Sequence, residues 1–508
     1  MGGFHDEYNK IIVPLVKDLN ENIRVLEELF ADSADIIKRR LTIGGVNKVN
    51  VYVLYIDNMI DKLLIEEGIF RYLIYNTQLM PAQNQFDYIK ENGLRSADLD
   101  VVFTMNEAIE HVFGGDTLIL VDGYEKAIWV SYRKMASRGV EKSENEVAIR
   151  GSKESFSEAL YINRVLLRRR IKDTKFKIKQ MKIGTRTKTD VAIAYMEDII
   201  RPEILLDVER RLSEFIIDGI FDSGMLEQLL CQNKHSIFPE FQATERPDKV
   251  ASAVTEGRIA IIVDNSPMVL LLPTTLNSFF QASDDAYNHW FIATWLRILR
   301  YIGVFITIAL PGLYIAVVNY QAEFLSSALA LSMAASRVGV PFSVVMEVII
   351  LEIAFEMLLE AGVRLPGPMG STLGIVGGLI IGDAAVSANL VSPVVVIIIA
   401  LTAIAAFTVP NEGFASTFRI IRYMIIFLSA FWGLYGFVIG MMLILIHLAS
   451  LKSFGVLYLA PFVASDLNDG NDSKDALIKR SIKDLKKRPI FARKGERDRL
   501  IWKNKEKK

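Results

Sequence analysis

The stretch IIRYMIIFLSAFWGLYGFVIGMMLILIHLA (420–449) is thirty residues long, and Arg422 is its only Asp, Glu, Lys or Arg. A transmembrane helix needs about 20 predominantly apolar residues, so this stretch is long enough to cross a bilayer. Three further stretches approach or exceed that length: 301–318, 346–370 and 391–409. All four lie between residues 289 and 463, so the sequence predicts an all-α polytopic membrane domain there.

Charge is distributed unevenly along the 508 residues. The net charge is −8 over 1–288, 0 over 289–463 and +7 over 464–508. Lys and Arg stay on the cytosolic side of a membrane, and a basic segment after a span can also rest on anionic lipid. Because the first twenty residues contain no signal-peptide core, we expect the N- and C-termini to be cytosolic. Cys231 is the only cysteine, which fits a reducing compartment.

If both ends are cytosolic, the number of full crossings is even. We predict four crossings, with 371–383 as a half-helix inserted from the cytosolic side. The crossings are placed near 298–318, 342–361, 391–409 and 420–449. This path leaves Arg419 and Arg422 near the outer end of the last crossing, against the charge rule.

Residues 1–288 contain an internal repeat. VYVLYIDNMI (51–60), a strand leading into a helix, recurs 140 residues later as VAIAYMEDII (191–200). GGDTLILVDGYEKAIWV (114–130), two strands joined by an Asp-Gly turn, recurs at an offset of 142 as EGRIAIIVDNSPMVLLL (256–272).

The predicted fold class is therefore an α/β soluble region of two similar subdomains followed by an all-α polytopic membrane domain. The predicted domains are 1–150 and 151–288 for the two subdomains, 289–463 for the transmembrane domain and 464–508 for a basic cytosolic tail.

The soluble region offers no spacing typical of a catalytic or metal site. The repeated Asp122 and Asp264 can be metal or phosphate ligands, but Asp also starts tight turns, and we favour that interpretation. The run RRR (168–170) can contact nucleic acid, but the soluble region is acidic, so a solvated helix face is the better interpretation. We expect no enzyme activity, no cofactor, no metal and no nucleic-acid partner.

Four glutamates, at positions 347, 352, 356 and 360, lie inside the stretch 346–370. On a helix Glu352, Glu356 and Glu360 form one stripe, while Glu347 lies well round the other side. Acids at the centre of a span are costly in lipid, so the stripe must face protein or water.

Two interpretations of these acids stay open. In the functional one, Glu352 and Glu356 line a water-filled cation path, for which Asp383 is a further candidate. In the structural one, which we favour for Glu347 and Glu360, the acids pair with arginines. The candidate partners are Arg297, Arg300, Arg337 and Arg364, with Arg419 and Arg422 also available in the same section.

A glycine-rich segment follows, with Gly370, Gly374, Gly378 and Gly382 at strict four-residue spacing. Glycines so spaced lie along one helix face and let a second backbone approach closely, so they predict helix packing within the chain or with a neighbouring subunit. Asp383 and Pro393 come next. They indicate either a broken segment lining a cavity or, as we favour, a Pro-kinked span with a satisfied Asp.

The chain resembles the A subunits of the spore germinant receptors of Bacillus- and Clostridium-type endospore formers. The resemblance extends from about residue 40 to 463 and is carried by FPEFQATERPDKV (238–250), VDNSPMVLLLPTTL (263–276), LLEAGVRLPGPMGSTLGIVGGLIIGDAAVSANLVSP (358–393) and TAIAAFTVP (402–410). Stage V sporulation AF-type proteins share the same architecture and form the other branch of the resemblance.

The resemblance implies a multi-pass protein of the spore inner membrane that takes part in nutrient sensing. It implies assembly with a transporter-like B subunit and a lipoprotein C subunit, and a homo-oligomer that conducts cations. It supplies no catalytic residues. The alternative is a subunit of a secondary transporter, with its site at the midplane in the broken glycine-rich segment. Transporters commonly repeat within the membrane section, whereas the repeat found in this sequence is in the soluble half, which favours the receptor.

Overall fold

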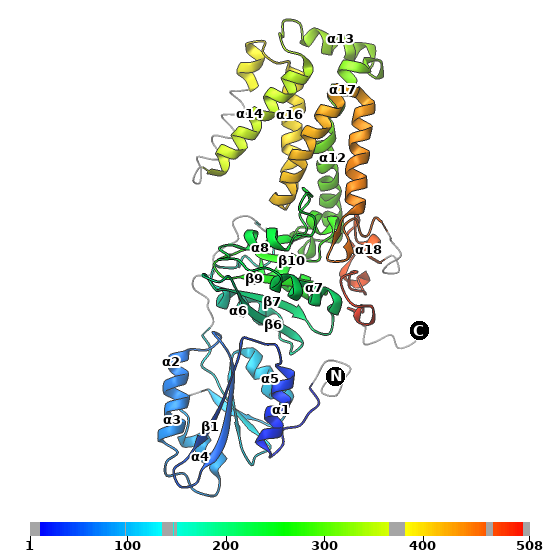
Figure 1. Cartoon of the computed structure of the whole chain (residues 1–508). Helices are drawn as coiled ribbons and strands as arrows, with labels where there is room; N and C mark the ends of the chain where they lie inside the picture. Colours follow the sequence, from blue (N-terminus) through cyan, green and yellow to red (C-terminus); the bar gives the residue numbers. More distant parts are fainter. Residues whose placement is uncertain are drawn as a thin grey trace, which may run out of the picture. The chain divides into compact units, whose positions relative to one another are not determined.

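The computed structural model describes residues 11–96, 98–134, 146, 150–364, 382–463 and 471–500. The chain forms two compact units. Unit 1 contains Met1–Lys234, Phe241–Pro273 and Lys486–Lys508, and unit 2 contains His235–Glu240 and Thr274–Leu485. Unit 1 is α/β and the long helices lie in unit 2 (Figure 1), which confirms the predicted fold class. The borders differ from the predicted domains, since 274–288 belongs to unit 2 and the tail is divided after residue 485.

The first repeat of unit 1 is a five-stranded antiparallel sheet in the order β1-β2-β4-β5-β3. Its strands are β1 (Ile36–Ile43), β2 (Val49–Ile56), β3 (Leu99–Val102), β4 (Thr117–Val121) and β5 (Ala127–Val130), and its helices are α1 (Leu19–Leu29), α2 (Lys62–Ile65), the π-helical η1 (Glu66–Phe70), α3 (Arg71–Tyr75), α4 (Gln85–Asn92) and α5 (Met105–Gly114). Successive residues of β4 belong to different cores: Leu118 and Leu120 pack with α1 and α5, whereas Ile119 and Val121 pack with α2, α3 and α4. Because both faces of the sheet are covered, β4 is buried throughout and apolar from Leu118 to Val121.

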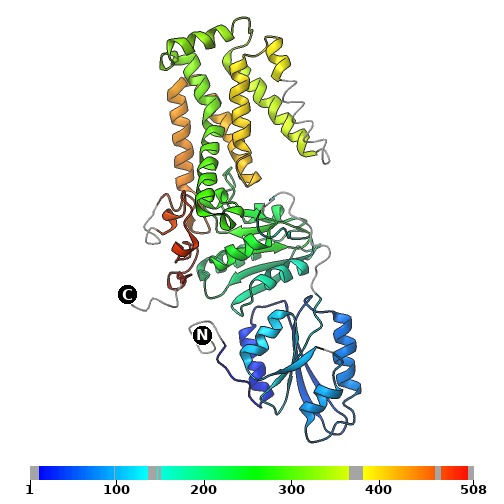
Figure 2. The same cartoon turned by 180° about the vertical axis from the view of Figure 1, so that it is seen from behind.

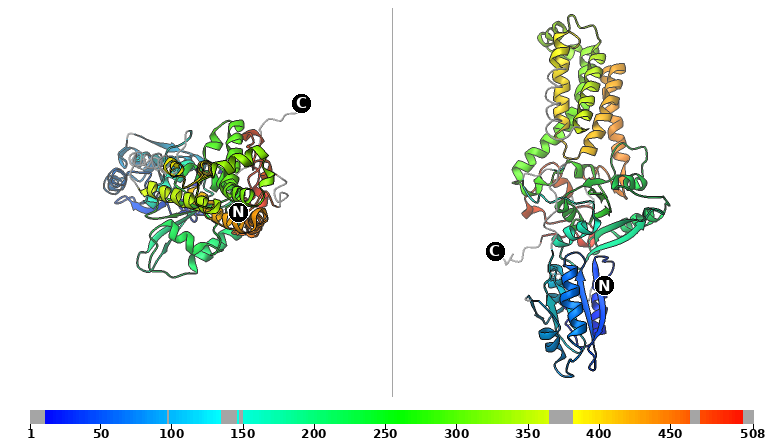
Figure 3. Two further views of the ribbon diagram at one scale, coloured as in Figure 1. Left: turned by 90° about the horizontal axis from the view of Figure 1, so that it is seen from above. Right: turned by 90° about the vertical axis from the view of Figure 1, so that its left-hand side faces the viewer.

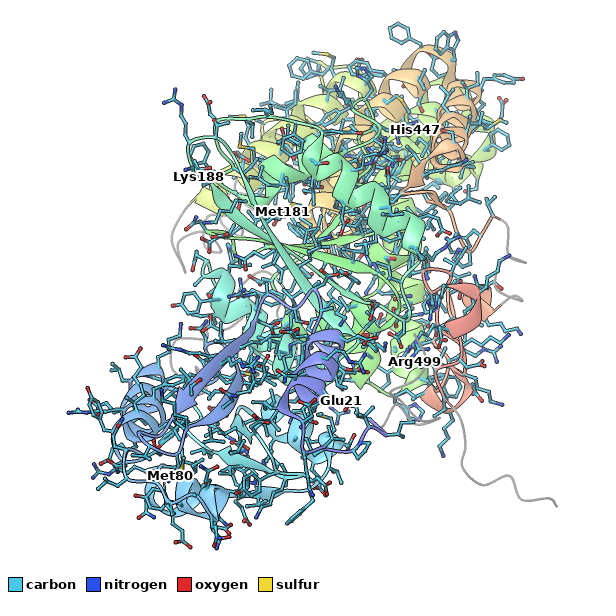
Figure 4. The ribbon with its side chains drawn as sticks, turned by 60° about the horizontal axis from the view of Figure 1, so that its bottom comes forward. Glu21, Met80, Met181, Lys188, His447 and Arg499 are labelled. Carbon is cyan, nitrogen blue, oxygen red and sulfur yellow. The ribbon has the colours of Figure 1, made fainter. Side chains whose placement is uncertain are left out.

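The second repeat has the same plan, with strand order β6-β7-β9-β10-β8. Its elements are α6 (Leu160–Arg170), β6 (Phe176–Ile183), β7 (Thr189–Met196), α7 (Pro202–Ser213), α8 (Ser223–Leu230), β8 (Gln242–Thr244), α9 (Pro247–Thr255), β9 (Ile259–Val263) and β10 (Val269–Leu272). Ile36 pairs with Ile56 in the first hairpin and Phe176 with Met196 in the second, which confirms the repeat at an offset of 140. In Figure 4, Met181 lies on the long β6–β7 hairpin and Lys188 near its tip.

The repeated aspartates hold the helix that precedes each sheet. Asp122 Oδ1 accepts a hydrogen bond from the backbone N–H of Leu19 at 3.4 Å, and Asp264 Oδ1 accepts one from Leu160 at 3.0 Å. These two leucines are the first residues of α1 and α6. Each aspartate ends a strand and is followed by a residue of positive φ, as a tight turn requires. The bonds support the turn interpretation.

Buried charges join the two repeats. Arg168 on α6 is fully buried and forms two hydrogen bonds with Asp35, at 2.8 Å from Nε and 2.9 Å from Nη2. Lys177 on β6 donates from Nζ to the carbonyl oxygen of Leu29 at 2.9 Å, and burial lowers the pKa of this lysine. The predicted solvated face over 168–170 is therefore wrong for Arg168, which the α-helical register turns inward toward the first repeat.

Unit 2 is built around α12 (Trp290–Tyr320), which packs against α16 (Pro393–Ala406) and α17 (Glu412–Ser450). α13 (Ser327–Ser336) crosses one end of these helices, and α14 (Val344–Arg364) packs beside α16 and leans away from it toward its own C-terminus (Figure 2). The remaining elements are α10 (Leu276–Phe280), α11 (Asp284–Tyr287), η2 (Ala322–Phe324), β11 (Lys452–Ser453), β12 (Val456–Leu457), α18 (Asn471–Lys474) and η4 (Ile482–Asp484), and in unit 1 η5 (Lys494–Glu496). Among the described residues, α12 and α17 are long and apolar enough to cross a membrane.

α17 reverses direction at Gly433, where φ is 56° and ψ is −135°. A Cβ on Gly440 would lie 2.6 Å from Ile425 Cδ1, although residues 425 and 440 of a straight helix are about 22 Å apart. The arms 412–432 and 434–450 are therefore antiparallel, and the side view in Figure 3 shows the helices of unit 2 running alongside one another. The predicted single crossing over 420–449 is wrong, because Gly433 permits the turn and Gly436 permits close contact with the backbone of Leu428.

One end of unit 2 is an aromatic base, formed by Phe238, Phe279, Phe280, Phe414, Phe418 and Tyr458. α17 starts and ends at this base, and Tyr320 at the C-terminal end of α12 contacts the turn at Gly433. α16 runs toward the base, since Thr408 lies against Gly303 on α12. The predicted outward direction of 391–409 is therefore wrong. Arg419 consequently lies in the half of its arm that is nearer the base, and Arg422 lies at the middle of that arm.

The pair between the repeats can be tested with Asp35→Asn. This change leaves Arg168 buried without its opposite charge, and the loss of one partner of a buried pair typically costs about 3–5 kcal/mol. We expect the free energy of unfolding of the detergent-solubilised chain to fall by about that amount. Glu154→Gln is the control, because Glu154 pairs with Arg169 and Arg170, all three side chains are partly exposed, and the loss should stay below about 1 kcal/mol. Equal effects of the two changes would contradict the structural role of the buried pair.

The reversal in α17 can be tested with Gly433→Ala. Any side chain at this φ and ψ is strained by about 1–3 kcal/mol, and the added Cβ would lie 2.8 Å from the ring of Tyr320. Thermal unfolding should therefore occur at a lower temperature than in the parent. Gly413→Ala in the first turn of the same helix, where the Cβ has ordinary room, should be neutral or slightly stabilising. If α17 were one continuous helix, Gly433→Ala should instead raise the unfolding temperature, because alanine stabilises a helix interior by about 1 kcal/mol relative to glycine.

Candidate ion path

The four glutamates at 347, 352, 356 and 360 all lie on α14. It is a 21-residue helix from Val344 to Arg364, and its apolar residues on the exposed side include Ile350, Ile353 and Met357. Glu352 is buried, Glu356 is half-buried and Glu360 is exposed. The stripe therefore turns gradually from the interior of the helix bundle to its surface.

Glu347 is a structural residue. Its side chain is fully buried, and one carboxylate oxygen lies 3.3 Å from Arg337 Nη2. The other accepts a hydrogen bond at 2.8 Å from the backbone N–H of Ser392, which is the N-cap of α16. A carboxylate at a helix N-terminus is favourable because it meets the free N–H groups and the positive end of the helix dipole. Glu347 thus joins α13, α14 and α16.

Glu352 forms a buried ion pair with Arg422 on the first arm of α17. Nη2 of Arg422 lies 2.8 Å from Glu352 Oε2, and the two side chains are 4% and 2% exposed. Glu352 Oε1 and Arg422 Nε are also buried, and neither has a hydrogen-bond partner among the described residues. The pair is neutral overall but leaves hydrogen-bonding capacity unused, which is costly where the dielectric is low.

Glu356 lies one turn further along and is more open. Its Oε1 is 3.0 Å from Arg419 Nη1, and its Oε2 is 3.9 Å from Arg422 Nη2. The Glu356 side chain is 37% exposed. Two acids of α14 and two arginines of α17 therefore form one alternating cluster, in which Glu352 is sealed and Glu356 is accessible.

The proposed arginine partners are only partly those that the structure uses. Arg337 pairs with an acid of α14, as predicted, but Arg297 and Arg300 pair with Asp285 instead, at 3.3 and 2.7 Å. They lie on the first turns of α12, which face α11 at the base. The side chain of Arg364 lies outside the described residues.

Arg419 and Arg422 were named only as further arginines available in the same section, and not among the four candidate partners. The first arm of α17 starts at the base and is antiparallel to α14, since Glu352 pairs with Arg422 and Glu356 with Arg419. Arginines three residues apart then face glutamates four residues apart, and this matched spacing is the sequence signal that could have identified them.

The other predicted site residues are less informative. Gly370, Gly374 and Gly378 lie outside the described residues, and a Cβ on Gly382 would make an ordinary 3.4 Å contact with Val396. Asp383 is exposed, and none of the described ion pairs joins it to α14. No group of three or more His, Cys, Asp or Glu is placed to hold a metal in the part of the chain that the structure describes.

Comparison with known proteins gives matches over nearly the whole chain. A family model described as Bacillus/Clostridium GerA spore germination protein matches residues 24–491. Spore germination protein KA of Bacillus subtilis (strain 168) is 38% identical over 454 residues, which cover 89% of this chain and 83% of that protein. Stage V sporulation protein AF of the same organism is 29% identical over 433 residues, covering 85% and 86%.

A solved structure also matches. It is the crystal structure of the N-terminal domain of the A subunit of the Bacillus megaterium spore germinant receptor GerK3. The identity is 30%, the TM-score is 0.42, and the match covers 52% of this chain and 98% of that one.

The two acids of the cluster should respond differently to neutralisation. Glu352→Gln strands the buried charge of Arg422, which typically costs about 3–5 kcal/mol, so the amount of chain in the membrane fraction should fall strongly. Glu356→Gln removes a partly exposed partner, and the amount should stay near that of the parent. Immunoblots of membrane fractions measure both. The double change Glu352→Gln with Arg422→Gln removes both charges of the pair and should recover most of the loss. A parental amount of the Glu352→Gln chain, or a loss that the double change does not recover, would refute the pairing.

Proposed function

Because the chain belongs to the Bacillus/Clostridium GerA family of spore germination proteins, we propose that it is the A subunit of a nutrient receptor in the spore inner membrane. There it couples nutrient sensing to the cation release that starts germination. The observation that carries the proposal is the family match over residues 24–491, which includes the α/β repeats and the long helices alike. The alternative branch, a stage V sporulation AF-type protein, has the lower identity of the two curated relatives reported above.

Unit 2 has the features of a membrane-embedded bundle. Its exposed surface on α12, α16 and α17 is rich in large apolar side chains, such as Phe305, Ile404 and Leu445, and a contiguous apolar surface of this kind needs a partner or lipid. Trp295 near the base and Trp432 at the far turn are both exposed. Aromatic residues of this type concentrate at the two membrane interfaces. The 26 residues from Trp295 to Tyr320 on α12 extend about 37 Å, which is enough to cross a hydrocarbon core of about 30 Å and reach the interface on each side.

The corrected helix directions also improve the charge distribution. With the base on the cytosolic side, Arg419 lies in the cytosolic half of its arm and Arg422 at the middle, so neither is near the outer end that the charge rule disfavours. Both chain ends then belong to the cytosolic side, since α17 returns to the base before the tail begins. The weakness of the four-crossing path is removed by the reversal at Gly433.

In this proposal α14 borders the cation path, and the α14–α17 cluster keeps the path closed. Glu352 anchors α14 to Arg422, while Glu356 presents a carboxylate that water can reach. Opening requires α14 to move relative to α17. This movement breaks the ion pair between Glu356 and Arg419, and the freed carboxylate of Glu356 then attracts cations. The unused hydrogen-bonding capacity of Glu352 and Arg422 lowers the cost of such a movement, because the closed pair is not fully satisfied.

The proposed partners follow from the family resemblance. A transporter-like B subunit and a lipoprotein C subunit complete the receptor, and copies of this chain surround the path as a homo-oligomer. The exposed apolar face of α14, which includes Ile353 and Met357, is the surface offered to such neighbours. A secondary transporter with a site in 370–393 is less favoured, because the repeat that the structure shows lies in unit 1, whereas transporters commonly repeat within the membrane section.

The role of Glu356 can be tested in spores. Glu356→Gln should leave the amount of complete complex unchanged but slow cation release after nutrient addition by at least about 5-fold, since one unit charge at 4 Å attracts a cation by about 1 kcal/mol even in water. Glu356→Asp keeps the charge and should release cations at close to the parental rate. Normal amounts and normal release from Glu356→Gln would move the conducting path away from α14, most directly to the segment around Asp383.

A further inference from the structure

The basic tail is divided between the two units, and several of its described charges in unit 1 bond within that unit. Ala492 is buried in the core of the second repeat. Arg488 donates from Nε to the carbonyl oxygen of Thr255 at 3.0 Å, and the backbone N–H of Arg493 donates to Ile199 at 2.9 Å. Arg499 pairs with Glu256 at 3.3 Å. Residues 486–500 are thus a folded part of unit 1 and not a free basic segment.

Residues 473–484 behave differently, and we name them the tail strap. The strap is held to the first turns of α12 in unit 2. Asp475 Oδ1 lies 3.7 Å from Arg297 Nη1, and the backbone N–H of Lys479 donates to Thr294 Oγ1 at 3.1 Å. Arg297 is itself buried and bonded to Asp285. The strap therefore has a fixed position beside the start of a long apolar helix.

The strap exposes apolar and basic side chains in alternation. Leu477, Ile478 and Ile482 are 44%, 56% and 68% exposed. Arg480 and Lys483 are exposed between and after them, whereas Lys479 is turned toward Asp475 at 3.5 Å. The strap carries four basic and two acidic residues, and Asp475 is already paired. The exposed face is consequently apolar with excess positive charge.

The neighbouring turns of α12 expose large aromatic side chains. Trp290, Phe291 and Trp295 are 44%, 65% and 59% exposed. Thr294 and Arg297, which hold the strap, are on the same turns. Tryptophan is typical of the membrane–water boundary, and lysine and arginine at that boundary meet lipid phosphates. The strap therefore lies where α12 passes from polar to apolar surroundings.

We infer that the tail strap and the first turns of α12 form a docking surface for the anionic headgroups of the surrounding lipid. Arg480 and Lys483 bind the headgroup phosphates, while Ile478 and Ile482 enter the boundary between headgroups and acyl chains. The basic side chains favour anionic over neutral lipid, and burial of the exposed isoleucines holds the strap at the level of the headgroup boundary. This inference rests on the membrane position of unit 2 in the proposed function, and it adds a lipid-dependent contact that the family match does not contain.

The test uses the full chain in nanodiscs of phosphatidylcholine and phosphatidylglycerol at one fixed ratio. Cys231→Ser removes the only cysteine, and Ile482→Cys then carries a fluorophore in the strap. Two samples are compared that differ only in which lipid carries a nitroxide near its headgroup. In one sample a small fraction of the phosphatidylglycerol is labelled, and in the other the same fraction of the phosphatidylcholine. We expect stronger quenching by the labelled phosphatidylglycerol, because the strap enriches anionic lipid around the probe.

Removing the charges should remove this preference. Arg480→Gln with Lys483→Gln eliminates two basic residues, each of which changes association with an anionic surface about 5-fold, or about 30-fold together. Quenching by the two labelled lipids should then become equal. Arg186→Gln with Lys188→Gln at the tip of the β6–β7 hairpin (Figure 4) makes the same charge change elsewhere and should leave the preference intact.

A second probe separates failure of this inference from failure of the membrane position. Ile404→Cys lies on the exposed side of α16, and its fluorophore should be quenched by acyl-chain nitroxides on either lipid. If the probe at 404 is quenched but the probe at 482 is not, the docking surface alone is overturned. The same conclusion follows if the probe at 404 is quenched and the two labelled headgroups quench the probe at 482 equally. Absence of quenching at both positions overturns the membrane position together with it.

Discussion

A buried carboxylate and a buried guanidinium must form an ion pair, because an unpaired buried charge is costly. In unit 2 this constraint fixes the arrangement of the helices. Glu352 and Arg422 are 70 residues apart in the chain and form a 2.8 Å pair. The pair holds α14 against the first arm of α17, which is antiparallel to α14 because α17 starts at the base. Glu347, fixed by Arg337 and the N-terminus of α16, orients the other end of α14. Two acidic residues thus position one helix against three others, and the third acid, Glu356, is left where water can reach it.

The two repeats of unit 1 show how one plan can be kept while the surfaces change. The strand order is identical, and the aspartate that ends β4 or β9 anchors the preceding helix in both repeats. Residues at the junction are not repeated: Asp35 precedes β1, and Arg168 belongs to the last turn of α6. The conserved plan accounts for stability within each repeat, whereas the unique charged pair accounts for the way the repeats join.

The α/β repeat was predictable from the sequence because its strands alternate with regular turns. The similar segments also recur in the sequence at offsets of 140 and 142 residues. The path of the helices was not, since hydrophobic length alone does not distinguish one long span from a hairpin. Gly433, Gly436 and Gly440 carry the difference, through a backbone angle and two close contacts that hydropathy ignores. The acidic stripe was predictable from helical periodicity, but its partners depended on the direction of α17. Arg168 was assigned to a solvated face because the soluble region is acidic, and only its α-helical register turns it into the protein.

The placement of Ala492 in the core of the second repeat has a consequence for synthesis of the chain. Gly257 must lack a side chain there, because a Cβ would lie 2.8 Å from the Cα of Ala492. The ribosome makes β9 and β10 more than two hundred residues before it makes the segment that covers them, and all the long helices are translated in between. The second repeat therefore reaches its final packing only after the helical region has been completed, so a chain truncated among those helices carries an open apolar surface that a full-length chain does not.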